Sequence, residues 1–278
     1  MGTNLEKFFF RMGARVKVAE FAIARSGWRR VNSRGDDLRI ILNIGRDRLG
    51  DFFEIRTLAG TSHELLVLNA DPRKKHLLLL SRQFDEQGKL HAKQKFLCGQ
   101  DEGHWFVAAI PEDEPVSTVA AAQIALKPGE VRVREEAMGV TRKEGFRRRN
   151  AAFIRQGEWF FLPAGEIQTD PLRLLRNEPI SRGNGGSPHR AELCYRMGGE
   201  TVYVSTKYPS GLTAREYFRL PEKERNRGFR MMKRDATVYV RGEITHRDHK
   251  TVHLNGWHRV LMNTESRSKA MRFLAFLD

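Results

Sequence analysis

The sequence predicts an α+β fold of two β-rich halves, with an N-terminal helix and a helical closing segment. Three observations lead to this prediction. Apolar residues recur at helical spacing near the N-terminus, short runs of β-branched and aromatic residues follow in both halves, and a helical pattern returns near the last residues. With 40% hydrophobic residues, the 278-residue chain can bury a core, which argues against a disordered protein.

The first half is expected to be a domain over residues 1–127. Leu5, Phe9, Val16 and Ile23 belong to one apolar stripe, which predicts a helix over residues 4–25 that ends near Gly27. An Ala-rich helix is expected to close the domain over residues 116–126. Between the helices, a small antiparallel sheet packed on the first helix is predicted from strands at residues 38–43, 52–58, 64–69, 76–83 and 104–110.

The second half is expected to be a β-rich domain over residues 151–278. Residues 128–150 precede it as a basic linker or exposed arm, because charge replaces apolar periodicity there. Thr213-x-x-Glu216 is a capping-box pattern, which predicts a short helix over residues 214–220. The closing helix is expected over residues 265–277. Strands are expected at residues 152–162, 201–205, 237–242, 251–254 and 257–262.

The positive charge is concentrated in two segments. The chain carries 49 Lys and Arg against 34 Asp and Glu, a formal net charge of +15. Residues 141–155 hold six basic residues and one Glu, and residues 223–241 hold seven basic and two acidic residues. Such local density is what phosphate binding requires. The candidate phosphate contacts are Arg142, Lys143, Arg147, Arg148, Arg149, Arg155, Arg225, Arg227, Arg230, Lys233 and Arg234.

Aromatic residues lie beside both basic segments. Stacking of an unpaired base on such a ring contributes roughly 1–3 kcal/mol, which favours single-stranded or looped nucleic acid over a duplex. The alternative is that the basic residues lie in solvated loops and the rings belong to the core. The aromatic residues are Phe146, Phe153, Trp159 and Phe160 near the first segment, and Tyr217, Phe218 and Phe229 near the second.

These patterns predict a basic protein that binds RNA or single-stranded DNA. Nucleic acid is the expected partner, and a subunit of a ribonucleoprotein or mobile-element complex, with protein partners, would use the same basic surface. Asp101, Glu102, Glu112, Asp113 and Glu114 form an acidic edge, which either repels nucleic acid or docks the basic arm.

Four histidines within thirteen residues predict a second function. His246, His249, His253 and His258 lie in one string, and Asn255-Gly256 predicts a hairpin turn that places His253 opposite His258. Opposed imidazoles can share a metal ion or relay a proton. The alternative function is therefore a metal-dependent hydrolase or nuclease with a divalent metal ion as cofactor. Its catalytic candidates are His246, His249, Asp248 and Glu243. Two alternatives stay open for these histidines, namely contact with phosphate and no special role.

Part of the second half resembles a known group of proteins. Arg155-Gln156-Gly157-Glu158 precedes an aromatic strand, His189 follows a Gly-rich loop, and His246-Arg247-Asp248-His249 precedes another strand. About 110 residues with this pattern resemble small uncharacterised bacterial proteins that open with an Arg-Gln-Gly-Asp strand and carry a later His-x-(Asp/Glu)-His element. The chain departs from them at Glu158. The resemblance implies no activity. It implies that His189 converges with His246 and His249, so the candidate metal ligands are His189, His246, His249, His253 and His258.

Two further features concern the setting of the protein. Cys98 and Cys194 are the only cysteines, so no disulfide framework is expected and a cytoplasmic location fits best. No apolar run approaches the roughly 18 residues of a spanning helix, so no membrane span is expected. If the basic segments and the histidines open onto one groove, cleavage of nucleic acid is favoured over binding alone.

Overall fold

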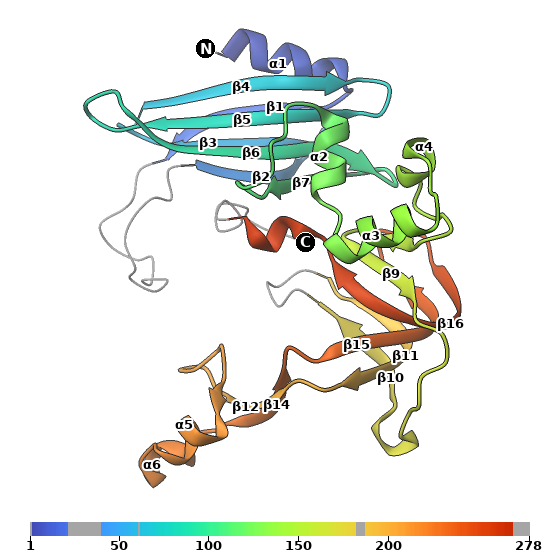
Figure 1. The fold of residues 1–278 in the computed structure, drawn as a ribbon. Coiled ribbons are helices and arrows are strands. Elements are labelled where there is room, and N and C mark those ends of the chain that lie inside the picture. The colour runs from blue at the N-terminus through green and yellow to red at the C-terminus, as the bar shows by residue number, and fades with distance from the viewer. Residues whose placement is uncertain (1, 22–39, 61, 182–186, 269–278) are drawn as a thin grey trace.

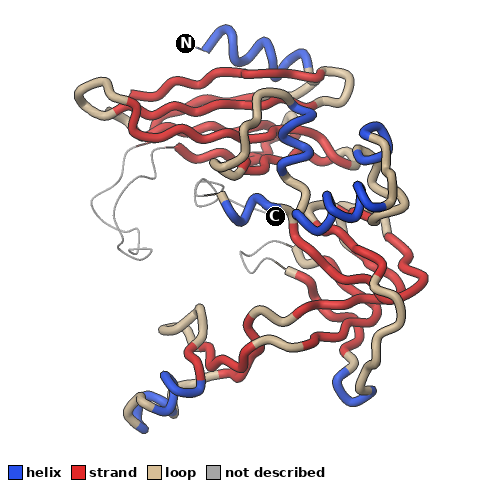
Figure 2. Tube along the Cα trace, in the orientation of Figure 1, coloured by secondary structure: helices blue, strands red, loops and turns tan. Residues whose placement is uncertain are grey.

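A computed structural model describes residues 2–21, 40–60, 62–181 and 187–268 (Figure 1). Strands dominate both halves, and the helices are short and few beside them (Figure 2). The predicted β-rich α+β character is confirmed for the described residues. Among them, no helix combines the length and the apolar character needed to span a membrane.

The first half contains two sheets and an N-terminal helix. Helix α1 spans Gly2–Arg11. Strands β4 (Ser62–Asp71), β5 (His76–Phe84), β6 (Leu90–Asp101) and β7 (His104–Ile110) form an antiparallel sheet in that order. Strands β1 (Val16–Phe21), β3 (Gly50–Leu58) and β2 (Ile40–Asp47) form a second sheet in the order β1-β3-β2, in which β1 is parallel to β3.

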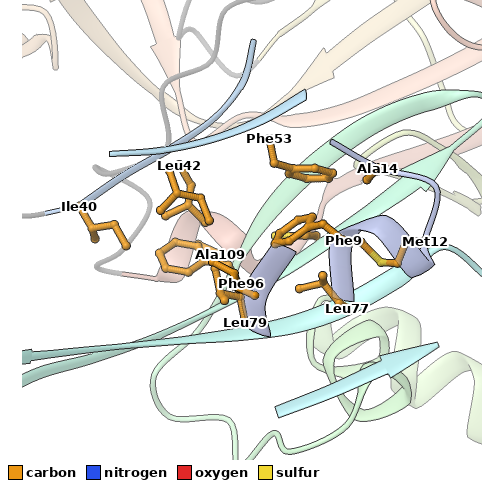
Figure 3. Close-up of a cluster of buried hydrophobic side chains, with 13 residues drawn as sticks. Phe9, Met12, Ala14, Ile40, Leu42, Phe53, Leu77, Leu79, Phe96 and Ala109 are labelled. Carbon is orange, nitrogen blue, oxygen red and sulfur yellow. The ribbon is translucent and has the colours of Figure 1, made fainter. Parts of the chain in front are cut away.

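The core of the first half lies between α1 and the two sheets. Phe9 of α1 packs against Phe53 of β3, with ring centroids 4.9 Å apart (Figure 3). Leu77 and Leu79 of β5 face this cluster, whereas Leu78 faces a separate cluster beneath helix α2 (Val119–Ala125). Strand β5 is therefore buried on both faces, which explains its unbroken run of leucines.

The predicted helix over residues 4–25 is wrong in its second part. The helix ends at Arg11, and Gly13 follows with a positive φ of 77°, a conformation that ends helices at little cost only for glycine. Val16 then belongs to β1, where it pairs with Phe53. The apolar stripe that predicted the helix therefore continues into β1. Its last member, Ile23, lies outside the described residues. Strand β6 was not predicted, because polar residues dominate its first half.

Residues 128–150 are helical and folded against the body, so the expectation of a linker or exposed arm is wrong. Helix α3 spans Gly129–Ala137 and helix α4 spans Arg142–Gly145. Val131 is fully buried in a cluster with Phe153 and Phe160 of the second half. At the start of α3, buried Lys127 forms an ion pair with Glu135 at 2.7 Å.

The second half is built on a six-stranded antiparallel sheet, in the order β10-β11-β15-β16-β9-β8. The predicted strand over residues 152–162 is a hairpin, because Gly157, with a φ of 56°, turns β8 back into β9. A short 3₁₀ helix, η1, spans Pro171–Arg173. The strands are β8 (Ile154–Gln156), β9 (Trp159–Pro163), β10 (Leu175–Ile180), β11 (His189–Met197), β15 (Thr237–Thr245) and β16 (Val252–Met262).

The predicted turn at Asn255-Gly256 is wrong. These residues lie within the continuous strand β16, at a register shift in its pairing with β15. Strand β15 pairs with residues 252–254 before them and 258–259 after them, so His253 lies opposite Glu243 and His258 lies opposite Val240. This pairing on either side of Asn255-Gly256 outweighs the local turn preference, so the two histidines are not partners.

The segment between β11 and β15 forms an arm, defined here as residues 200–234. Its sheet has the order β13-β12-β14, and Figure 1 shows it extending away from the six-stranded sheet. The predicted capping box is confirmed, since Thr213 and Glu216 cap α5 reciprocally. The elements of the arm are β12 (Glu200–Val204), β13 (Leu212–Thr213), α5 (Ala214–Phe218), α6 (Glu222–Arg225) and β14 (Arg230–Arg234).

The end of the described chain returns to the first half. The hydroxyl of Thr264 donates to the carbonyl of Ala125 at 2.6 Å, which fastens the chain to the end of α2. Only a short 3₁₀ helix, η2 (Thr264–Arg267), is found there, so the predicted closing helix is not seen. Residues 269–278 of that prediction lie outside the described residues.

Candidate metal centre

A pocket of about 480 Å³ lies between the two halves and is lined by both. The first half contributes residues of β6 and β7, including Asp101 and His104. The hairpin β8–β9 and the loops of the second half form the opposite wall. The described residues that carry candidate chemistry in this lining are Arg147, Arg148, Arg155, Gly157, His189, His246, Asp248 and His249.

Three histidines converge at this pocket. Each of His189, His246 and His249 offers one nitrogen, and these atoms all lie within 4.8 Å of one another. The ring centroids of His189 and His246 are 4.3 Å apart, and those of His246 and His249 are 4.8 Å apart. The convergence implied by the resemblance is therefore present in the geometry.

Strand pairing brings these histidines together. His189 is the first residue of β11 and His246 directly follows β15, while the neighbouring pair Arg190 and Thr245 is in register across the two strands. Two positions beside such a pair in an antiparallel ladder lie close in space. His249 lies in the loop that continues from His246 to β16. The cluster thus depends on a strand register and on one loop.

The Arg-Gln-Gly element supports that loop. Buried Gln156 donates Nε2 to the carbonyls of Ile244 and Lys250, at 3.2 Å and 2.7 Å, and so holds both ends of the histidine loop. A Cβ at Gly157 would lie 2.9 Å from Nε2 of His249 and 3.4 Å from Nε2 of His189. Only glycine leaves this space beside the histidine nitrogens open. The two elements that carry the sequence resemblance therefore meet at one place.

Glu102 of the first half fixes the orientation of His249. Its Oε2 lies 2.7 Å from Nδ1 of His249, so a neutral imidazole donates its Nδ1 proton to the carboxylate. The lone pair then lies on Nε2, which faces the cluster. Glu102 belongs to the predicted acidic edge, but nothing in the sequence indicates that it pairs with His249.

His246 is held by two backbone groups. Its Nδ1 accepts from the amide of Asp248 at 3.1 Å, so Nε2 carries the proton and donates to the carbonyl of Ser187, also at 3.1 Å. To bind a cation, His246 must exchange one of these two hydrogen bonds for the ion, and binding through Nε2 requires the proton of the neutral ring to move to Nδ1.

The donor set fits a divalent transition-metal ion. Tetrahedral Zn²⁺ with Zn–N distances near 2.0–2.1 Å places its ligand nitrogens about 3.4 Å apart. The three nitrogens lie within 4.8 Å of one another, so side-chain rotations that move each nitrogen by about an ångström would bring them to this separation. Three imidazoles leave one coordination position for water or substrate, as catalytic zinc sites do.

The other two candidate ligands lie outside this cluster. His253 is exposed on β16, with Nδ1 3.4 Å from Oε1 of Glu243. His258 is buried, its Nδ1 donates to the carbonyl of Gly256 at 2.9 Å, and burial lowers its pKa. Neither histidine is among the pocket-lining residues, and the same holds for Glu243. The structure thus brings together three of the five candidate ligands.

Asp248 is the candidate catalytic carboxylate that lines the pocket. Burial acts to raise its pKa, but the hydrogen bond and charge of Arg247, together with His104 and His246, outweigh this effect and lower it. Asp248 is therefore an anion at neutral pH.

The first basic segment is divided between ion pairs and the pocket. Arg148 forms ion pairs with Asp101 and Glu102, and Arg155 pairs with Asp101 at 3.1 Å. Asp101 and Glu102 of the acidic edge thus dock the basic segment, which was one of the two expectations for this edge. Arg147 is exposed, lines the pocket, and forms no ion pair with another described residue. Three further basic residues of the segment are exposed but do not line the pocket, namely Arg142, Lys143 and Arg149.

Most aromatic residues near the first basic segment cannot stack on a base. Phe153, Trp159 and Phe160 are buried in the hydrophobic clusters of the second half, so the stacking expectation is wrong for them. Phe146 lines the pocket with Lys74 and Lys127 near its ring. The sequence cannot separate core rings from surface rings, because both follow the same strand pattern.

The second basic segment lies on the arm and not at the pocket. Arg227, Arg230 and Lys233 are exposed, whereas Arg234 pairs with Glu200. Arg225 is half-buried, with its guanidinium 6.0 Å from the ring centroid of Phe218. No described arm residue lines the pocket. The histidines therefore share a pocket with the first basic segment only.

Comparison with known proteins adds no name to this geometry. No family model matches the chain, and neither a curated protein nor a solved structure matches it.

Proposed function

We propose that this protein is a metal-dependent hydrolase that cleaves a phosphate ester of nucleic acid in the pocket between its halves. One observation supports the proposal above the others. Three convergent histidines and Arg147 line the same 480 Å³ pocket, so a candidate cation site shares this space with a guanidinium that pairs with no other described residue. Guanidinium groups bind phosphate oxygens with two parallel hydrogen bonds.

The chemistry follows from the donor set. His189, His246 and His249 would hold a divalent ion, which would supply a bound water of lowered pKa and polarise a phosphoryl oxygen. Asp248, one of the carboxylates that line the pocket, would take a proton from the attacking water. The water oxygen would form a bond to phosphorus as the bond from phosphorus to the leaving oxygen breaks, and the leaving oxygen would receive the proton held by Asp248. Arg147 stabilises the negative charge on the phosphoryl oxygens.

The size of the pocket points to an unpaired substrate. A volume of about 480 Å³ lies within the roughly 300–1,000 Å³ that small-molecule sites span. A single nucleotide fits such a space, whereas a duplex does not enter it. The proposed substrate is therefore RNA or single-stranded DNA. A cytoplasmic location is part of the proposal, because Cys98 and Cys194 are buried free thiols.

The test combines metal content with cleavage. The purified full-length protein is expected to hold about one divalent ion and to cleave single-stranded oligonucleotides. His249→Ala should lose both, whereas His253→Ala serves as the matched control, since His253 is exposed outside the pocket. A wild-type protein without bound metal, and without stabilisation by added Zn²⁺, Mn²⁺, Fe²⁺ or Ni²⁺, would contradict the proposal.

A second candidate function is binding of nucleic acid by the arm. Strand β14 is an edge strand whose Arg230, Met231, Met232 and Lys233 are all exposed, and Phe218 nearby is 61% exposed. Exposed cations beside apolar and aromatic side chains suit a single strand, which offers phosphates and base faces. This surface would serve equally a subunit of a ribonucleoprotein or mobile-element complex.

Salt dependence tests this second function. Replacing Arg227, Arg230 and Lys233 with Ala should weaken binding of a single-stranded oligonucleotide. The slope of log K against log salt should become shallower by up to about 2, at about 0.7 per lost phosphate contact. The matched control replaces Arg142 and Lys143, which lie outside the arm. Equal affinity and slope in the arm variant would exclude the arm as the binding surface.

A further inference from the structure

Glu102 occupies a backbone conformation that its residue type disfavours. It is the first residue of the two-residue turn between β6 and β7, with a φ of 52°, and Gly103 follows with a φ of 93°. Positive φ at both positions is the type I′ turn, in which Asn-Gly is favoured. A glutamate there carries backbone strain, and strained residues of this kind cluster at functional sites.

The contacts of the side chain show what that task is. Oε2 accepts from Nδ1 of His249 at 2.7 Å and from the amide of Lys250 at 3.2 Å. Oε1 forms an ion pair with Arg148. The side chain of Glu102 is only 10% exposed, so these hydrogen bonds form in a largely desolvated place. A turn of the first half thus binds a proposed metal ligand of the second half.

We propose that Glu102 is the positioning residue of the metal centre and makes metal binding depend on the docking of the two halves. This inference rests on the proposed metal-dependent function. The carboxylate holds the His249 ring with its proton on Nδ1 and its lone pair on Nε2. Carboxylate partners of this kind also raise the basicity of a ligating imidazole, and their removal typically lowers metal affinity 10–100-fold.

The linkage acts in both directions. If docking of the turn orients His249 and so strengthens metal binding, bound metal must strengthen docking by the same factor. Zn²⁺ is therefore expected to protect the amides of the β6–β7 turn from hydrogen exchange. A site confined to the second half would leave exchange in the first half unchanged.

The test uses a variant that favours the turn and removes the contact. Glu102→Asn creates Asn-Gly, the preferred type I′ sequence, while the shorter side chain cannot span the same distance to His249. The variant is expected to fold and to bind Zn²⁺ with a Kd raised 10–100-fold. Asp235→Asn is the matched control, because Asp235 is also an acidic residue with a positive φ, of 56°, but is exposed and does not line the pocket. Its Kd should stay within about twofold of the wild type.

A second readout does not involve the metal. The ¹⁵N chemical shifts of the His249 ring, in the metal-free protein at pH 8, should show the proton on Nδ1 in the wild type and a shift toward Nε2 in Glu102→Asn. A wild-type ring protonated on Nε2, or an unchanged Zn²⁺ Kd in Glu102→Asn, would overturn this inference alone. Failure of the wild type to bind Zn²⁺ would overturn the proposed function and with it the role of Glu102.

Discussion

Gly157→Ala provides a direct probe of the cation site, because its Cβ would enter the space beside the histidine nitrogens. The new carbon would lie 2.9 Å from Nε2 of His249 and 3.4 Å from Nε2 of His189. An ion held by both nitrogens lies about 2.1 Å from each of them. The methyl group therefore competes with the ion for the same volume.

The magnitude can be separated from backbone strain by a matched variant. Gly157 has a φ of 56°, and Gly165, in the loop after β9, has a φ of 68° with nothing within 4 Å of an added Cβ. Alanine at either position costs about 1–2 kcal/mol in the left-handed region. Both variants should therefore lower Tm by a few degrees. Only Gly157→Ala should also weaken metal binding, by at least tenfold, or about 1.4 kcal/mol.

The assay is titration of both purified variants with Zn²⁺, by calorimetry and by the rise in Tm with metal concentration. Cleavage of a single-stranded oligonucleotide should fall with metal occupancy in Gly157→Ala and stay near the wild-type rate in Gly165→Ala. Equal Zn²⁺ affinity in the two variants would refute the placement of the ion between His189 and His249.

Two further predictions concern Arg147 and His258. Arg147→Ala should lower the rate of cleavage at subsaturating oligonucleotide at least tenfold, while Zn²⁺ affinity stays unchanged. Arg142→Ala is the control, because Arg142 lies outside the pocket. A parallel loss of metal affinity in Arg147→Ala would contradict the role in phosphate binding. Burial holds the pKa of His258 below its unfolded value of 6.5, so the unfolded chain takes up the proton first, and stability is lost as the pH falls below 6.5. In urea unfolding, His258→Gln should lose less stability than the wild type between pH 7 and pH 5, and an identical loss would contradict this assignment.

Predictions from local sequence succeeded where neighbours along the chain decide the structure. The capping box at Thr213 and Glu216 formed as predicted, because its hydrogen bonds join residues three positions apart. The first helix began as predicted but ended at Arg11, since a stripe of apolar residues does not record where the chain leaves the helix. Asn255-Gly256 failed as a turn because β15 pairs with β16 both before these residues, at 252–254, and after them, at 258–259.

The candidate site divides in the same way. The sequence indicated His246 and His249 from their spacing, and His189 through a resemblance. The roles of Gln156 and Gly157 could not be predicted, because Gln156 acts on the carbonyl of Lys250, 94 positions away. For the aromatic residues beside the first basic segment, the sequence left stacking on a base and a place in the core as alternatives, and Phe153 and Phe160 belong to the core.

By itself, the sequence determined the β-rich character, the positive charge and the histidines that supply candidate chemistry. Composition and short-range patterns are properties of the chain and do not depend on how its strands are arranged. Only the tertiary structure decided that the three histidines meet, that Arg147 lines their pocket and that Glu102 holds His249 from 147 positions away. Those relations depend on strand register and on the docking of the two halves, which bring together residues that lie far apart in the sequence.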